Sequence, residues 1–73
     1  MILWRVRGYA DTEGEVAGSE VVCSIDRLPT VYRLLVEHGS MVQVDELHVS
    51  EAAAHQKAEA LKAELLKQGW TAA

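Results

Sequence analysis

The segment from Ser50 to Trp70 constrains the fold most, because its sequence predicts a helix with both ends defined. Almost every residue from Glu51 to Gln68 is a strong helix former, and none is proline or β-branched. Ser50 is a good N-cap, and Gly69 suits the left-handed position that follows a helix in a Schellman motif. We therefore expect about 18 helical residues, a rod of roughly 27 Å.

The predicted helix has one apolar face that another element has to cover. The apolar side chains follow helical spacing: Ala54, Ala58, Leu61 and Leu65, with Leu66 and Trp70 beside them. Lysine and glutamate occupy the opposite face. The alanines leave room for close approach, so we expect the helix to lie across a sheet.

Two strands are expected in the N-terminal half. In residues 1–9, strict alternation places two sets of side chains on opposite faces: Ile2, Trp4 and Val6 inward, and Leu3, Arg5, Arg7 and Tyr9 outward. Residues 20–25 likewise direct Val21, Cys23 and Ile25 inward. Glycines and polar residues between these strands, in residues 10–19, indicate a turn or loop.

Residues 26–39 fit two interpretations. Pro29 can open a helix and Gly39 can close one, which favours a short helix. The alternative is a strand from Thr30 to Glu37, favoured by its β-branched and aromatic residues, which would form a hairpin with the next strand. That next strand covers residues 41–49.

In residues 41–49 the apolar pattern changes parity. Val42 and Val44 are expected on one face, whereas Leu47 and Val49 have the opposite parity. The strand therefore ends, or carries a bulge, after Asp45 and Glu46.

These elements predict a single α+β domain over residues 1–73. The favoured form is ββαβα, with a three-stranded sheet and both helices on one face. The alternative is a four-stranded antiparallel meander followed by the C-terminal helix.

Composition excludes several classes of function. The net charge is −4, and the four acidic residues within 11–20 account for all of it, since seven acidic and seven basic residues lie elsewhere. No basic stripe is present, which argues against nucleic-acid binding. No apolar run approaches the ~20 residues of a membrane span, and no secretion signal is recognisable. A lone cysteine cannot form an internal disulfide, so we expect a cytoplasmic protein.

The sequence shows little sign of catalysis. No glycine-rich phosphate loop or nucleophile elbow occurs. Cys23 is expected to be a buried small hydrophobe rather than a nucleophile. His48, Glu51 and His55 form the one grouping that resembles a metal site, but their spacing differs from HExxH. We assign no catalytic, cofactor-binding or metal residues, and no cofactor.

We therefore expect a non-enzymatic protein-interaction or regulatory module that binds another protein or itself, for example as a homodimer. Strands followed by a capped helix ending in Gly-Trp are typical of small bacterial and phage proteins. The candidate partner-binding residues are Arg5, Arg7, Tyr9, Glu13 and Glu15. The alternative is a small-ligand or metal-binding domain with a pocket lined by Trp4, Tyr32 or His48.

Overall fold

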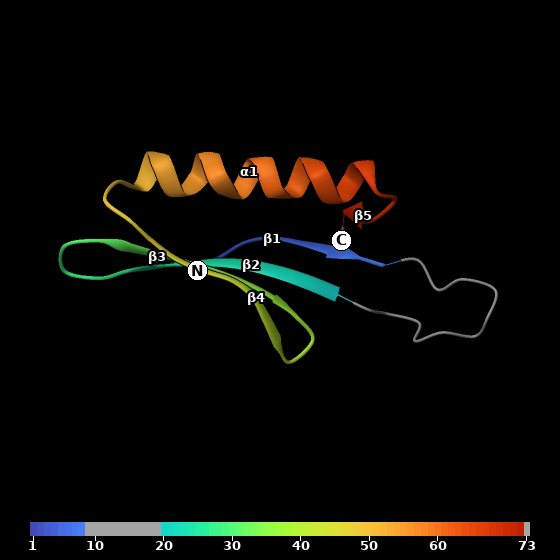
Figure 1. The fold of residues 1–73 in the computed structure, drawn as a ribbon, viewed down its shortest axis with the longest axis horizontal. Coiled ribbons are helices and arrows are strands. Elements are labelled where there is room, and N and C mark those ends of the chain that lie inside the picture. Colours follow the sequence, from blue (N-terminus) through green and yellow to red (C-terminus); the bar gives the residue numbers. More distant parts are fainter. Residues whose placement is uncertain (9–19, 73) are drawn as a thin grey trace.

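An antiparallel sheet is covered on one face by a helix (Figure 1). The computed structural model describes residues 1–8 and 20–72. In chain order the elements are β1 (Ile2–Arg7), β2 (Glu20–Arg27), β3 (Tyr32–His38), β4 (Met41–His48), α1 (Glu51–Lys67) and β5 (Thr71–Ala72). The five strands lie in the order β4-β3-β2-β1-β5.

The predicted α+β class is confirmed, and of the two expected forms the alternative is the correct one. β1 to β4 form an antiparallel meander, and α1 follows it. The favoured ββαβα arrangement is wrong, because the segment assigned to its first helix is strand β3. The sheet also gains β5, which pairs with β1 and was not expected. Two residues are too few to produce a recognisable strand pattern.

The helix predicted within residues 26–39 is wrong because its proline and glycine lie in turns. Pro29 lies in the connection between β2 and β3, across which the Leu28 N–H donates to the Val31 carbonyl at 2.9 Å. Gly39 has a φ of +64° in the tight turn between β3 and β4. A positive φ serves a two-residue hairpin as well as a helix C-terminus. The burial of Leu34 and Val36 shows the period of two that a strand requires.

A bulge in β1 corrects the expected faces of the first strand. Trp4 and Val6 are buried, as predicted. The register shifts between Ile2, which pairs with Ser24, and Trp4, which pairs with Cys23. The extra residue moves Ile2 to the face that lacks the helix, whereas Leu3 packs against the core.

A second bulge corrects the expected faces of β4. Val44 pairs with Val36 and Val42 pairs with Glu37, so Gln43 is the extra residue. Val42 and Val44 therefore lie on opposite faces, not on one. The sequence predicts a change of parity in this strand, but the change occurs before Val44 rather than after Glu46.

The core lies between α1 and the sheet. Its buried side chains are Trp4, Val6, Val21, Cys23, Ile25, Leu34, Val36, Ala54 and Ala58. The indole Nε1 of Trp4 donates to the carbonyl of Ala58 at 3.0 Å. Ala54 and Ala58 of α1 are both fully buried. Their small side chains let the helix approach the sheet closely enough for this bond.

Both predicted helix ends are confirmed. The Ser50 hydroxyl accepts from the Ala53 N–H at 3.1 Å. At the other end, Gly69 has a φ of +106° and donates to the Leu66 carbonyl, while Trp70 donates to the Leu65 carbonyl. These two bonds constitute a Schellman motif, which returns the chain to the sheet at β5.

Candidate interaction surface

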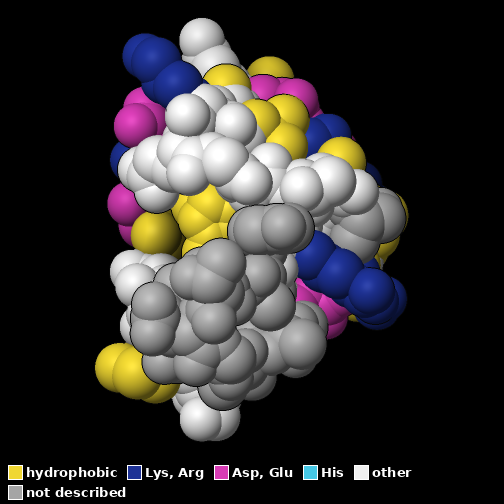
Figure 2. Space-filling model, turned by 90° about the vertical axis from the view of Figure 1, so that its right-hand side faces the viewer, with side chains coloured by type: hydrophobic (Ala, Val, Ile, Leu, Met, Phe, Trp, Pro, Cys, Tyr) yellow, Lys and Arg dark blue, Asp and Glu magenta, His cyan; other side chains and the backbone are white. Residues whose placement is uncertain are grey.

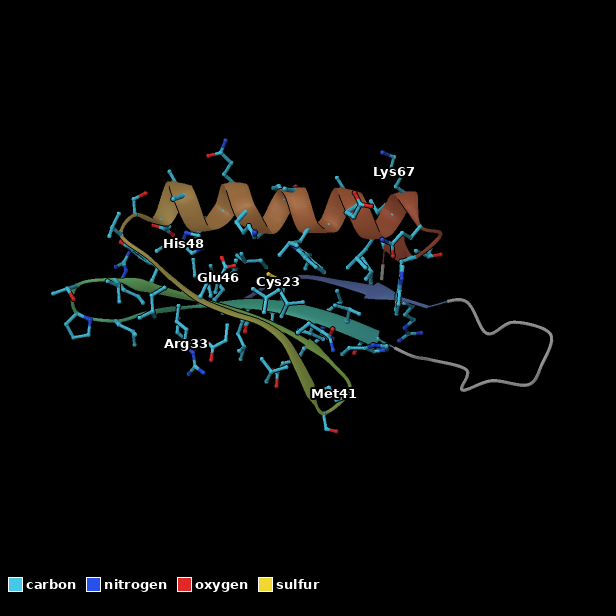
Figure 3. The ribbon with its side chains drawn as sticks, in the orientation of Figure 1. Cys23, Arg33, Met41, Glu46, His48 and Lys67 are labelled. Atoms are coloured by element: carbon cyan, nitrogen blue, oxygen red, sulfur yellow. The ribbon has the colours of Figure 1, made fainter. Side chains whose placement is uncertain are left out.

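The sheet has one face that no described element covers. α1 lies on the opposite side, and in Figure 3 Arg33 points away from the helix while Cys23 points toward it. Strand pairing shows which side chains share the uncovered side, here called the open face. They are Ile2, Arg5, Arg7, Glu20, Val22, Ser24, Asp26, Arg33, Leu35, Glu37, Val42, Asp45 and Leu47.

Several large apolar side chains of the open face are in contact with solvent. The exposed fractions are 49% for Ile2, 52% for Val42 and 63% for Leu47. Val22 and Leu35, nearer the middle of the sheet, are half-buried. Single exposed apolar residues are normal on a protein surface, whereas five on one sheet face indicate a surface suited to binding protein.

Charge is unevenly distributed across the open face. On β1 it carries Arg5 and Arg7, and Glu20 lies 3.9 Å from Arg7. On β3 and β4 it carries Glu37 and Asp45 together with Arg33. The β1 side is therefore basic and the β3–β4 side is acidic. Figure 2, which views the end where α1 terminates, shows basic, acidic and hydrophobic side chains next to one another on the surface.

A bidentate ion pair lies on the acidic side of the open face. The Arg33 guanidinium donates from Nε and Nη2 to the two carboxylate oxygens of Asp45, at 2.9 and 2.8 Å. This hydrogen bonding lowers the pKa of Asp45 and raises the pKa of Arg33. Asp26 and Glu37 also raise the Arg33 pKa, so three carboxylates lie near one guanidinium. The surroundings of Arg33 are thus net negative.

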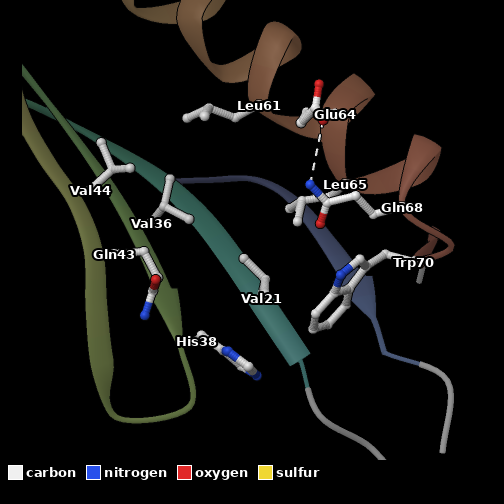
Figure 4. A pocket seen from close by; sticks show the side chains of 10 residues that line it. All are labelled: Val21, Val36, His38, Gln43, Val44, Leu61, Glu64, Leu65, Gln68 and Trp70. Atoms are coloured by element: carbon white, nitrogen blue, oxygen red, sulfur yellow. Dashed lines mark hydrogen bonds between the residues drawn. The ribbon is translucent and has the colours of Figure 1, made fainter. Parts of the chain in front are cut away.

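A small cleft of about 220 Å³ lies on the helix side, between the β3–β4 hairpin and the C-terminal half of α1 (Figure 4). Val36, Leu61 and Leu65 line it, with Trp70 at one end. The Trp70 ring meets the His38 ring edge-on, with centroids 5.4 Å apart. The cleft lies where the β3–β4 hairpin bends away from α1 (Figure 1).

A more polar cleft lies near the start of α1. Its walls are Met1, Ile25, Asp26, Arg27, Tyr32 and Glu51. Of the three residues expected to line a ligand pocket, Tyr32 lies here. Trp4 belongs to the core, and His48 forms a 3.0 Å hydrogen bond with Glu46.

The residues weighed for chemistry are not gathered into one site. Burial raises the pKa of the Cys23 thiol to about 11, and the carboxylate of Glu59 adds to the shift. His55 lies 3.5 Å from Glu51, whereas His48 lies beside Glu46. Within residues 1–8 and 20–72, no three His, Cys, Asp or Glu side chains are grouped to hold a metal ion.

Of the five candidate partner-binding residues, two can be placed. Arg5 and Arg7 lie on the open face, where alternation predicted them. Tyr9, Glu13 and Glu15 lie outside the described residues. The apolar members Val42 and Leu47 and the acidic Glu37 were missed. Their face depends on the β3–β4 register and its bulge, which local sequence patterns do not report.

The fold and this surface define a class: a small α+β domain in which one helix covers one face of an antiparallel sheet. Comparison with protein-family models, curated proteins and solved structures gives no match for this chain. In the described part of the chain, no helix has the length and apolar character required to cross a membrane.

Proposed function

We propose that this chain is a non-enzymatic interaction module that binds protein through the open face of its sheet. This proposal rests on the exposure of Ile2, Val42 and Leu47 on that face, which is 49%, 52% and 63%. Keeping these side chains in water costs roughly 25 cal/mol per Å² of apolar area, and a partner removes that cost.

The charged residues support binding of a protein rather than a membrane or nucleic acid. Basic and acidic groups alternate with apolar ones on the open face, as in an interface with specificity. Arg5 and Arg7 lie on one strand beside Glu20, and Arg33 is paired with Asp45, so the basic residues form no stripe that could follow a phosphate backbone.

The buried thiol supports the non-enzymatic part of the proposal. With a pKa near 11, Cys23 is a thiol and not a thiolate at neutral pH, and it is fully buried. A buried free cysteine is also compatible with a reducing, cytoplasmic setting, which forms part of the proposal.

Site-specific photocrosslinking in the cells that produce the protein tests this proposal. A photoreactive amino acid replaces Leu35, in the middle of the open face, and a matched variant carries it at Ala60, exposed on α1. We expect a covalent adduct with a polypeptide from position 35 and none from position 60. The adduct should disappear when Val42 and Leu47 of the same chain are changed to aspartate. Adducts from the helix alone would contradict the proposal.

The cleft in Figure 4 favours a second function, the binding of a small apolar ligand. Its volume of about 220 Å³ is below the ~300–1,000 Å³ of typical ligand pockets, which ranks this function second. Titration with small aromatic compounds should shift the side-chain amide NMR signals of Gln43 and Gln68 if the cleft binds them. Unchanged signals would remove this candidate.

A further inference from the structure

We propose that the partner of the open face is a second copy of this chain. The inference rests on the proposed function and specifies its partner. It begins with the arrangement of side chains into rows, because antiparallel pairing places cross-strand partners side by side. One row across the sheet contains Arg5, Val22, Glu37 and Val42, and the next contains Ile2, Ser24, Leu35 and Asp45.

A two-fold axis parallel to the strands suits this pattern. If the axis lies between two sheets stacked about 10 Å apart, it places β1 of one copy over β4 of the other and β2 over β3. Each row then faces the same row of the second copy in reversed strand order. The basic strand of each copy therefore faces the acidic strands of the other, which is the self-complementarity that a two-fold interface requires.

The specific contact predicted is Arg5 with Glu37 of the second copy. Arg5 lies opposite Val42 of that copy, and Glu37 is on the adjacent strand, about 4.8 Å to the side. An arginine side chain spans that offset. In the single chain, strand β2 separates the two residues. Because the axis repeats the contact, each dimer contains two such pairs.

Apolar side chains of both copies lie around the axis, beside the Glu37 that each copy directs to Arg5 of the other. Val22 and Leu35 of both copies meet around the axis. Ser24, the smallest side chain of the open face, lies opposite Leu35 of the second copy. The half-burial of Val22 and Leu35 in the single chain would become full burial in the dimer.

Charge reversal at two positions tests the dimer. R5E places two carboxylates together at each of the two contacts, and E37R places two guanidinium groups together. We expect each variant alone to be monomeric by light scattering, whereas the wild type has twice the mass of 8.0 kDa. An equimolar mixture of the two variants restores both contacts, so a heterodimer should form. The R5E/E37R double variant should form a homodimer.

The mixture tests for an intermolecular contact, because two reversed charges on different chains compensate each other only across an interface. Circular dichroism of each variant confirms the fold. K67E is the matched control, since Lys67 points away from the sheet (Figure 3), and it should remain dimeric.

Three outcomes would overturn the inference. They are a wild type that is monomeric at every concentration, single variants that stay dimeric, and a mixture that stays monomeric. The second would indicate pairing elsewhere, such as along β4, the outer strand of the described sheet. A monomeric wild type together with position-35 adducts to a different protein would leave the proposed function standing and refute only the self-association.

Discussion

Trp4 connects β1 to α1 over 54 positions of sequence. Its indole donates to a carbonyl of α1, and its ring contributes to the core. This bond depends on Ala58, because a larger side chain there would hold the helix away from the sheet. The alternation in β1 and the alanine spacing in the helix predicted both residues on the inner side, whereas the hydrogen bond between them required the tertiary structure.

The first prediction concerns this contact. Trp4→Phe should lower the free energy of unfolding by about 1–3 kcal/mol, because it removes a buried hydrogen bond and leaves a small void. Urea unfolding followed by circular dichroism measures the loss. Trp70→Phe is the control, since Trp70 is only half-buried and should cost less. An equal or smaller loss at Trp4 would contradict the account of the core.

Cys23 gives a prediction about pH. Burial holds its pKa near 11, above the ordinary thiol value. Below that ordinary value the thiol is protonated in both states, so its contribution to stability is fully present. As the pH rises toward about 11, the unfolded chain releases the proton first, and the contribution is lost.

The measurement compares the free energy of unfolding in urea of the wild type and Cys23→Ala, at pH 7 and at about pH 10. We expect the wild type to lose stability relative to the variant at the higher pH. In native protein near pH 7 the thiol should also resist disulfide reagents until urea unfolds the chain. A stability difference that is independent of pH would show that the thiol is not buried in the protonated form.

At the scale of elements, α1 was predictable because its signals are local. A side chain caps its first turn and a glycine follows its last, and both act within four residues. Strand β3 was not predictable in the same way, because a proline before it and a glycine after it are compatible with a helix or with two turns. Pairing with β2 and β4 on both sides decides for the strand.

Gly69→Ala tests the end of the helix. A Cβ at this position would meet nothing within 4 Å, so steric contact with the rest of the chain adds no cost. The free energy of unfolding is expected to fall by about 1 kcal/mol, and this loss comes from the positive φ alone. Thermal unfolding of the alanine variant should show a lower midpoint, and Gly69→Asn should lie between it and the wild type. An alanine variant as stable as the wild type would contradict the Schellman assignment.

At the scale of the whole molecule, residues 1–8 and 20–72 build two layers, one helix and one sheet, and none of these residues covers the other side of the sheet. The sequence indicated Arg5 and Arg7 as outward residues of β1. It did not indicate the full surface, because two bulges decide whether Ile2 and Val42 face the helix or the open side. The candidate site is therefore a product of register, which arises from contacts between distant parts of the chain.

The most direct test of the account is hydroxyl-radical footprinting of the wild type beside R5E, read by mass spectrometry at single side chains. If a second copy covers the open face, Leu47 and Val42 should be oxidised more slowly in the wild type than in R5E. Leu66, exposed on α1, should be oxidised equally in both. Equal oxidation of Leu47 in the two proteins would show that the open face is not covered, and would contradict the central claim.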